Sequence, residues 1–145
     1  GEDSLIPAQN LFPQLSAVAF GIKESLKVFG SDYPTVDGTG VRDFIHIMDL
    51  AKAHYKSLKA VSDGRSHCVN VGTGVGYSVL EVISAYRQIS GCEIPFRLEG
   101  RRPGDIGIAF ADPTNANKVL GWQSKENLIS MCESDWVWRK ALRDG

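Results

Sequence analysis

Hydrophobic and polar positions along the chain follow two spacings, about 3.6 residues and two residues, which are typical of helices and strands. The longer spacing predicts helices at about residues 10–21, 49–60, 78–90, 113–121 and 125–142. The shorter spacing predicts strands at residues 25–29, 41–47, 67–71 and 94–98. Turn-forming residues fill 31–40, so this segment is predicted to be a loop. Helices and strands alternate along the chain, which predicts an α/β fold.

Capping residues predict where several of these helices begin or end. Asp49 is predicted to cap the second helix, and the sequence from Ser78 to Glu81 forms a capping box for the third. Asp112 stands before a proline at the predicted start of the next helix, and Gly121 is expected to end it.

Composition excludes several classes of protein. The chain has 145 residues, of which 43% are hydrophobic and 23% charged, and its net charge is −1. We expect no nucleic-acid partner, because phosphate binders are normally basic. We expect no membrane association, because no apolar run approaches the roughly 20 residues of a membrane span. The three cysteines are widely spaced, which favours a reducing compartment and a cytoplasmic location.

The glycine-rich turn Gly72–Gly76 follows a predicted strand and precedes a helix, as a dinucleotide-binding turn does. The fingerprint G-x-G-x-x-G requires glycine where Tyr77 stands, so we predict a structural turn and no NAD bound to this chain. The three histidines lack metal-ligand spacing, so no metal site is expected. No catalytic residue is predicted either, because neither a nucleophile elbow nor a close carboxylate pair is present.

Arginines beside stiff turns suggest an anion site. Arg101 and Arg102 precede a Pro-Gly turn and Asp105, and Arg42 follows the turn-rich segment 37–40. The planar guanidinium group matches phosphate oxygens two at a time, and a carboxylate accepts hydrogen bonds from ribose hydroxyls. A double arginine alone is more often a solvated surface pair, but two separated arginines, each beside a stiff turn, favour an anion clamp.

Four segments resemble one family closely. Residues 40–54 (GVRDFIHIMDLAKAH), 29–40 (FGSDYPTVDGTG), 69–74 (VNVGTG) and 101–105 (RRPGD) are similar to the signatures of UDP-galactose 4-epimerases, in the extended short-chain dehydrogenase/reductase family. Residues 1–3 and 7–13 resemble the loop and helix that enter the sugar-nucleotide domain of that family. The resemblance covers essentially the whole chain.

The resemblance implies a set of residues that bind a UDP-sugar. Each part of UDP has its own set of residues. The diphosphate would be bound by Asn10, Leu11, Arg42 and Arg102, the uracil would lie along Lys27, Val28 and Phe29, and the uridine ribose would be bound by Asp105. Phe44 stands where the family often has tyrosine, so a hydroxyl is missing there. Ala109 corresponds to a position in the sugar pocket, where a small residue goes with acceptance of N-acetylated sugars.

The family's NAD-binding half and its catalytic Tyr-x-x-x-Lys pair are missing from this sequence. Tyr55 and Lys59 match the spacing by accident, because the resemblance places their helix away from catalysis. Residues 1–145 are therefore expected to be the C-terminal substrate-binding portion of an NAD-dependent UDP-glucose 4-epimerase, inactive alone and a homodimer when whole. Two alternatives stay open at this point. One is a related epimerase of UDP-pentoses or UDP-glucuronate, and the other is a non-catalytic module that binds nucleotide sugars.

Overall fold

The computed structural model describes residues 10–144 and has the predicted α/β fold. The helices are α1 (Leu11–Ala19), α2 (Ile47–Ala60), α3 (Val79–Ser90), α4 (Thr114–Leu120) and α5 (Leu128–Asp144), with a short 3₁₀ turn, η1 (Val61–Asp63), after α2. The strands are β1 (Leu26–Phe29), β2 (Val41–Asp43), β3 (Gly76–Ser78), β4 (Phe96–Glu99) and β5 (Ile108–Ala109). The resemblance at residues 1–9 lies outside the described residues.

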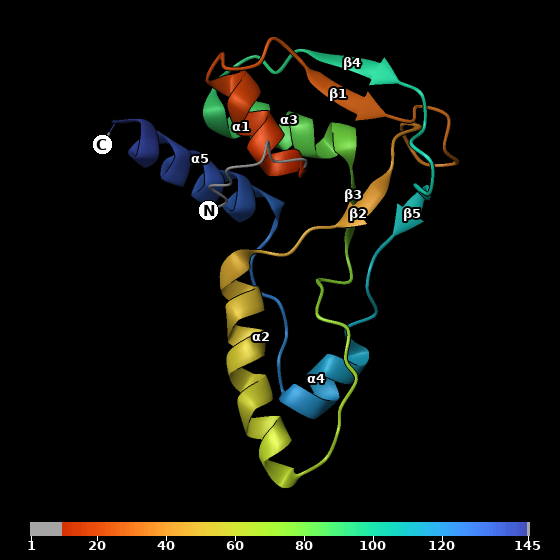
Figure 1. Ribbon diagram of the computed structural model, residues 1–145, viewed down its shortest axis with the longest axis vertical. Coiled ribbons are helices and arrows are strands. Elements are labelled where there is room, and N and C mark those ends of the chain that lie inside the picture. Colours follow the sequence, from red (N-terminus) through yellow and green to blue (C-terminus); the bar gives the residue numbers. More distant parts are fainter. Residues whose placement is uncertain (1–9, 145) are drawn as a thin grey trace.

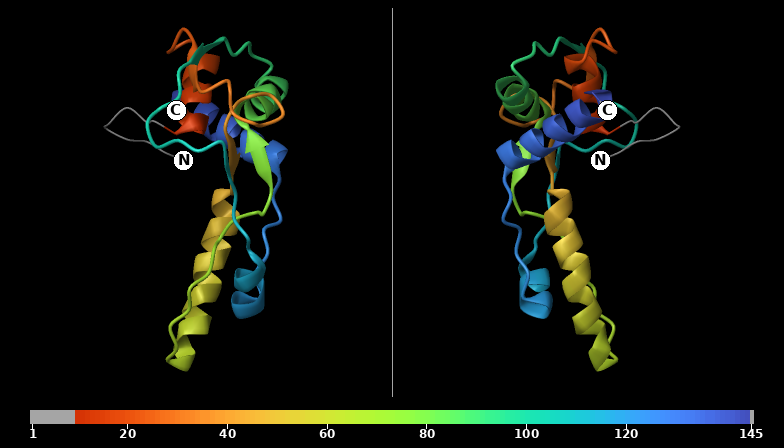
Figure 2. Two further views of the ribbon diagram at one scale, coloured as in Figure 1. Left: turned by 90° about the vertical axis from the view of Figure 1, so that its right-hand side faces the viewer. Right: turned by 90° about the vertical axis from the view of Figure 1, so that its left-hand side faces the viewer.

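The strands form two small sheets. β1 pairs in parallel with β4, while β2 lies between antiparallel β3 and parallel β5. Helices α1, α3 and α5 pack together next to the β1–β4 sheet, and Figure 1 shows this group at one end of the molecule. Helices α2 and α4 lie side by side at the other end, and α2 projects from the rest as a long column (Figures 1 and 2).

Each end has its own hydrophobic core. The larger core includes Leu15, Val28 and Tyr86, all at most 1% exposed. The smaller core, between α2 and α4, has Ala53, Ala116 and Trp122 as its fully buried members. The β2 sheet joins the two ends, so residues on β2 lie where they meet.

Local capping signals place two helix ends as predicted. The Ser78 side chain accepts the N–H of Glu81, and the Glu81 carboxylate accepts the N–H of Ser78, so the predicted capping box is confirmed. Gly121 ends α4 with a φ of 56°, in the left-handed region that glycine adopts without strain.

The predicted cap of α2 is wrong. The helix begins at Ile47, and its cap is His46, whose ring accepts the N–H of Met48. Asp49 lies in the first turn, is fully buried, and accepts the N–H groups of Lys125 and Glu126 at 2.7 and 2.8 Å. The last helix begins at Leu128 and not at residue 125, because Asn127 caps it by accepting the N–H of Ser130 at 3.0 Å.

Three other boundaries also differ from the prediction. Helix α4 begins at Thr114, one residue after the predicted position, although Asp112 still accepts the N–H of Thr114 at 3.0 Å. The predicted strand 41–47 ends at Asp43, since helix α2 takes up residue 47. The fourth predicted strand is shifted towards the C-terminus and runs from residue 96 to 99.

The predicted strand 67–71 is not formed among the described residues. Val69 and Val71 pack against the smaller core, as the alternating pattern requires, but the segment joins neither sheet. Its Cys68 carbonyl instead accepts a hydrogen bond from the Asn115 side chain at 2.7 Å. A strand needs a partner for its backbone groups, and no neighbouring strand lies beside this segment in the described chain.

Candidate functional site

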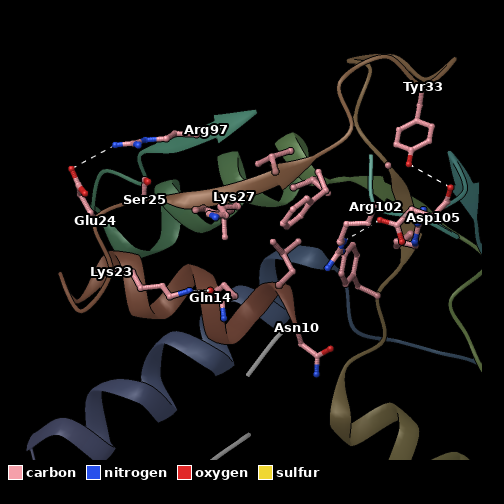
Figure 3. A pocket seen from close by; sticks show the side chains of 18 residues that line it. Asn10, Gln14, Lys23, Glu24, Ser25, Lys27, Tyr33, Arg97, Arg102 and Asp105 are labelled. Atoms are coloured by element: carbon pink, nitrogen blue, oxygen red, sulfur yellow. Dashed lines mark hydrogen bonds and ion pairs between the residues drawn. The ribbon is translucent and has the colours of Figure 1, made fainter. Parts of the chain in front are cut away.

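A cavity of about 840 Å³ lies between α1, β1 and the turn that follows β4 (Figure 3). Residues from several separate stretches of the chain line it. The predicted binding residues in its wall are Asn10, Leu11, Lys27, Val28, Phe29, Arg42, Phe44, Arg102 and Asp105. The fold therefore brings all but one of the predicted residues together, the exception being Ala109.

Strand β1 forms one wall because its side chains alternate. Leu26 and Val28 are 3% and 1% exposed and belong to the larger core. Lys27 is exposed and Phe29 half-buried, so these two side chains point away from that core. Phe44 completes the opposite side, with its ring 5.8 Å from that of Phe12 in an edge-to-face contact.

Phe29, Arg102 and Asp105 form a connected group at one end of the cavity (Figure 3). The Arg102 guanidinium lies 4.4 Å from the centre of the Phe29 ring, and its Nε donates to Asp105 at 3.2 Å. A guanidinium carries five N–H donors, so this one bond leaves others able to reach phosphate oxygens. The group combines an aromatic face, a cation and a carboxylate, which suit a base, a phosphate and a ribose.

Arg42 reaches the cavity from β2. Its Nη1 donates to the carbonyl of Val41 at 2.8 Å and lies over Gly40, where an added Cβ would come within 3.3 Å of it. The preceding turn is stiff, because Asp37 accepts hydrogen bonds from Thr39 and from the Ser78 hydroxyl. Burial raises the pKa of Asp37, but these hydrogen bonds outweigh it and hold the pKa below its ordinary value.

The two adjacent arginines do different things, which corrects the prediction of one cationic cluster at 101–102. Arg101 donates to the Asp32 carboxylate at 2.7 Å and to its carbonyl at 2.8 Å, and covers the ring of Tyr33. The hydrogen bond from Arg101 lowers the pKa of Asp32. Arg101 thus fastens the loop 31–40 to the turn at 101–105, while Arg102 faces the cavity.

The sequence did not reveal several other residues in the wall. Tyr33, 6% exposed, stands at the Asp105 end, and its hydroxyl donates to the Asp105 carbonyl at 3.5 Å. Lys23 and Arg97 stand at the opposite end, where Figure 3 shows Arg97 paired with Glu24. Arg97 lies beside Lys27 in the β1–β4 register, a pairing that no local pattern reveals.

Ala109 lines a second hollow of about 590 Å³. This hollow adjoins the first, because Arg42 is in the wall of both. Ala109 lies opposite Arg42 in the β2–β5 register, so the two residues are neighbours even though they come from distant segments. Residues 69–72 and 110–112 form most of the remaining wall.

The glycine-rich turn at 72–76 serves the fold. The N–H groups of Thr73 and Gly74 both donate to the Asp43 carboxylate at 3.0 Å. At the start of the following helix, the N–H of Glu81 donates to Ser78. A dinucleotide-binding turn uses such N–H groups for phosphate, whereas here the N–H groups of Thr73 and Gly74 already donate to Asp43.

Residues 10–144 contain neither a cluster of metal ligands nor a helix that could cross a membrane. Between residues 10 and 144, no three histidine, cysteine, aspartate or glutamate side chains are grouped so as to hold a metal ion. None of the helices described there has both the length and the apolar character needed to cross a membrane.

Comparison with known proteins gives consistent matches over the whole chain. The family model described as GDP-mannose 4,6 dehydratase matches residues 3–134. A UDP-glucose 4-epimerase of Bacillus subtilis is 49% identical over all of this chain, which spans 43% of that relative. The chain thus has less than half the length of the curated relatives that it matches.

Solved structures give the same picture. A UDP-glucose 4-epimerase from Stenotrophomonas maltophila, with NAD and formylated UDP-arabinopyranose bound, is 45% identical with a TM-score of 0.95. The match covers 99% of this chain and 43% of that one. A UDP-glucuronic acid 4-epimerase from Bacillus cereus is 25% identical with a TM-score of 0.79, covering 92% of this chain and 40% of the other. The architecture is that of part of an extended short-chain dehydrogenase/reductase.

Proposed function

The chain belongs to the GDP-mannose 4,6 dehydratase family, and from this premise we propose that the whole protein is a UDP-glucose 4-epimerase that interconverts UDP-galactose and UDP-glucose. Residues 1–145 would be its C-terminal, substrate-binding portion. The convergence of Phe29, Arg42, Arg102 and Asp105 on one cavity carries this proposal.

The parts of a UDP-sugar have matching groups in the two hollows. Uracil would lie along residues 27–29 with Phe29 against the base, and Asp105 would accept hydrogen bonds from the ribose. Arg42 and Arg102 would bind the diphosphate together with the start of α1 at Asn10 and Leu11. The sugar would then extend past Arg42 into the second hollow, towards Ala109, because Arg42 borders both spaces.

NAD would belong to the remainder of the whole protein, where it would supply hydride removal and return at C4 of the sugar. The role of this chain would be to hold the UDP portion while the sugar faces that chemistry. Its glycine-rich turn donates to Asp43, which supports placing the cofactor site elsewhere.

The alternatives are less well supported. The relatives called UDP-glucose 4-epimerase are 44–49% identical, compared with 25% for the UDP-glucuronic acid 4-epimerase. Turnover of UDP-glucuronate or UDP-pentoses with higher kcat/KM than UDP-galactose would favour a sister enzyme. A non-catalytic module would bind UDP but leave every UDP-sugar unchanged.

We also propose that the whole protein is a cytoplasmic homodimer. The three cysteines form no disulfide, as is usual in a reducing compartment. The dimer rests on the family resemblance alone, and sedimentation of the whole protein would test it.

Turnover of UDP-galactose in a coupled assay is the decisive experiment. The whole protein should be active and retain NAD, while residues 1–145 alone should neither turn over the sugar nor retain NAD. An inactive whole protein with bound NAD would contradict the proposed activity. Activity or copurified NAD in the isolated chain would contradict the proposal that NAD and the catalytic residues belong to the rest of the protein.

A further inference from the structure

The carboxylate of Asp43 connects three segments that wall the second hollow. Asp43 ends strand β2, directly after Arg42. Its two oxygens accept the N–H and hydroxyl of Thr73, at 3.0 and 2.5 Å, the N–H of Gly74 at 3.0 Å and the N–H of Ala111 at 3.2 Å. All these bonds join parts of the chain at least 30 positions apart in sequence.

One of these bonds extends the β2–β5 pairing. The parallel register pairs Val41 with Ile108 and Arg42 with Ala109, and then the backbone ladder stops. Two residues beyond the end of β5, the N–H of Ala111 donates to the Asp43 side chain at 3.2 Å. Ala109 is therefore fixed on one side by its pairing with Arg42 and on the other by the bond from Ala111 to Asp43.

The turn at Gly72 brings the third segment close to the same point. An added Cβ on Gly72 would lie 2.5 Å from the Ala111 side chain and 2.6 Å from the Asp43 carboxylate. Only glycine fits this approach, so the turn, Ala111 and Asp43 are in tight mutual contact. Movement of the carboxylate would move both other segments.

We propose that Asp43 is a positioning residue for the sugar end of the site: it sets the place of Ala109 relative to Arg42 and so controls discrimination between sugars. The inference rests on the proposed function, in which Ala109 borders the sugar. Asp43 itself lines the second hollow but not the first, where Phe29, Arg102 and Asp105 stand. Its effect should therefore fall on the sugar and not on UDP.

Asp43→Asn in the whole protein tests this role. The amide retains one acceptor oxygen, but its NH2 group would face N–H donors, so at least one segment loses its bond. We expect the ratio of kcat/KM for UDP-galactose to that for UDP-N-acetylgalactosamine to change by about ten-fold, the equivalent of one lost hydrogen bond. The Kd of UDP, measured by calorimetry, should stay within about two-fold of wild type.

Asp37→Asn is the matched control. Asp37 is also a half-buried carboxylate with three hydrogen bonds to Thr39 and Ser78, but it lines neither hollow. It should lower the melting temperature while leaving the substrate ratio unchanged. If Asp43→Asn and Asp37→Asn change the ratio and the UDP affinity alike, Asp43 is merely structural and the inference is overturned.

Thr73→Val is a milder variant that decides the matter if Asp43→Asn does not fold. It removes the hydroxyl bond to Asp43, together with the contacts of that hydroxyl to the Val75 backbone, and keeps the bonds from the N–H groups of Thr73, Gly74 and Ala111 to Asp43. A smaller shift of the substrate ratio in either direction, with unchanged UDP affinity, supports the role, and an unchanged ratio overturns it. Wild-type protein that turns over neither sugar would overturn the proposed function itself. This result is distinct from a changed or an unchanged substrate ratio in the variants.

Discussion

Arg42 and Arg102 reach the first cavity from different segments, β2 and the turn after β4. We expect Arg42→Ala and Arg102→Ala in the whole protein each to weaken UDP binding ten- to a hundred-fold. A hydrogen bond to a charged group contributes on the order of 1.5 to 3 kcal/mol, and about 1.4 kcal/mol corresponds to ten-fold in Kd. Isothermal titration calorimetry with UDP measures the change directly.

Arg87→Ala is the control for the loss of one positive charge. Arg87 lies on α3, pairs with Glu93 at 2.6 Å and lines neither hollow. Its UDP affinity should equal that of wild type. Unchanged affinity in both Arg42→Ala and Arg102→Ala would refute the assignment of the diphosphate to these two residues.

The size of residue 109 should decide which sugars are accepted. Ala109 borders the second hollow, and a small side chain there leaves room for an N-acetyl group at C2 of the sugar. We expect the whole protein to interconvert UDP-GlcNAc and UDP-GalNAc as well as the simple hexoses. Ala109→Tyr should abolish turnover of the N-acetylated pair and spare UDP-galactose, as measured by kcat/KM for each.

Ala109→Ser keeps the side chain small and should retain both activities. Wild-type enzyme that turns over UDP-galactose but leaves UDP-GalNAc untouched would show that the volume at residue 109 is not what limits the substrate.

Sequence motifs predicted which residues line the cavity better than they predicted which residues these side chains contact. Arg102 and Asp105 were found from a short stretch of sequence, because a charged pair beside a tight turn is a local feature. The separate role of Arg101 depends on Asp32, which is 69 residues away in the chain. The placement of Ala109 in a second hollow likewise depends on the pairing of β5 with β2.

At the scale of elements, local signals placed two helix ends correctly but failed at Asp49, which bonds to the N–H groups of residues 125 and 126 instead of capping its own helix. The capping box at Ser78 and the glycine at 121 act within one turn of helix, so the sequence contains all that determines them. Strands β3 and β5 have only three and two residues and exist because β2 lies between them. The segment 67–71 shows the converse, a good strand pattern without a partner in the described chain.

Asp49 joins α2 to the segment that precedes α5, and we expect this link to contribute to stability. Burial raises its pKa, but the N–H groups of Glu126 and Lys125 and the ammonium of Lys52 outweigh burial, so the pKa is lowered. A lowered pKa stabilises the fold above the ordinary value of about 4 and loses that contribution as the pH falls through the folded-state pKa. Asp49→Asn in the whole protein should therefore cost about 1–3 kcal/mol at pH 7 and less at low pH.

Urea unfolding of wild type and variant across this pH range provides the measurement. Asp112→Asn is a suitable control, because Asp112 also accepts a backbone N–H, from Thr114, and its pKa is lowered by the hydrogen bond from Thr114, but it is exposed. It should change stability less than Asp49→Asn does. Equal unfolding midpoints for wild type and Asp49→Asn would show that the link adds nothing.

On the scale of the whole molecule, the two ends differ in how fully their hydrophobic side chains are shielded from solvent. The larger core is enclosed by α1, α3, α5 and the β1–β4 sheet. Helix α2 contacts α4 on one side, but Ile47, Tyr55 and Leu58 are 61%, 78% and 69% exposed. These three positions have the spacing of one helix face, so α2 presents an apolar stripe to solvent.

We expect the isolated chain to self-associate through this end. An apolar helix face favours contact with a second copy, and so does a strand-like segment that joins neither sheet of the described chain. Sedimentation velocity should show a concentration-dependent rise in mean mass, and thermal unfolding should be broad.

Replacing Tyr55 and Leu58 together by glutamate should reduce the association, whereas replacing the exposed Val36 of the 31–40 loop should not. A monodisperse monomer at high concentration with a sharp cooperative melt would contradict this expectation, because it would show that the smaller core and the exposed face of α2 need no further cover.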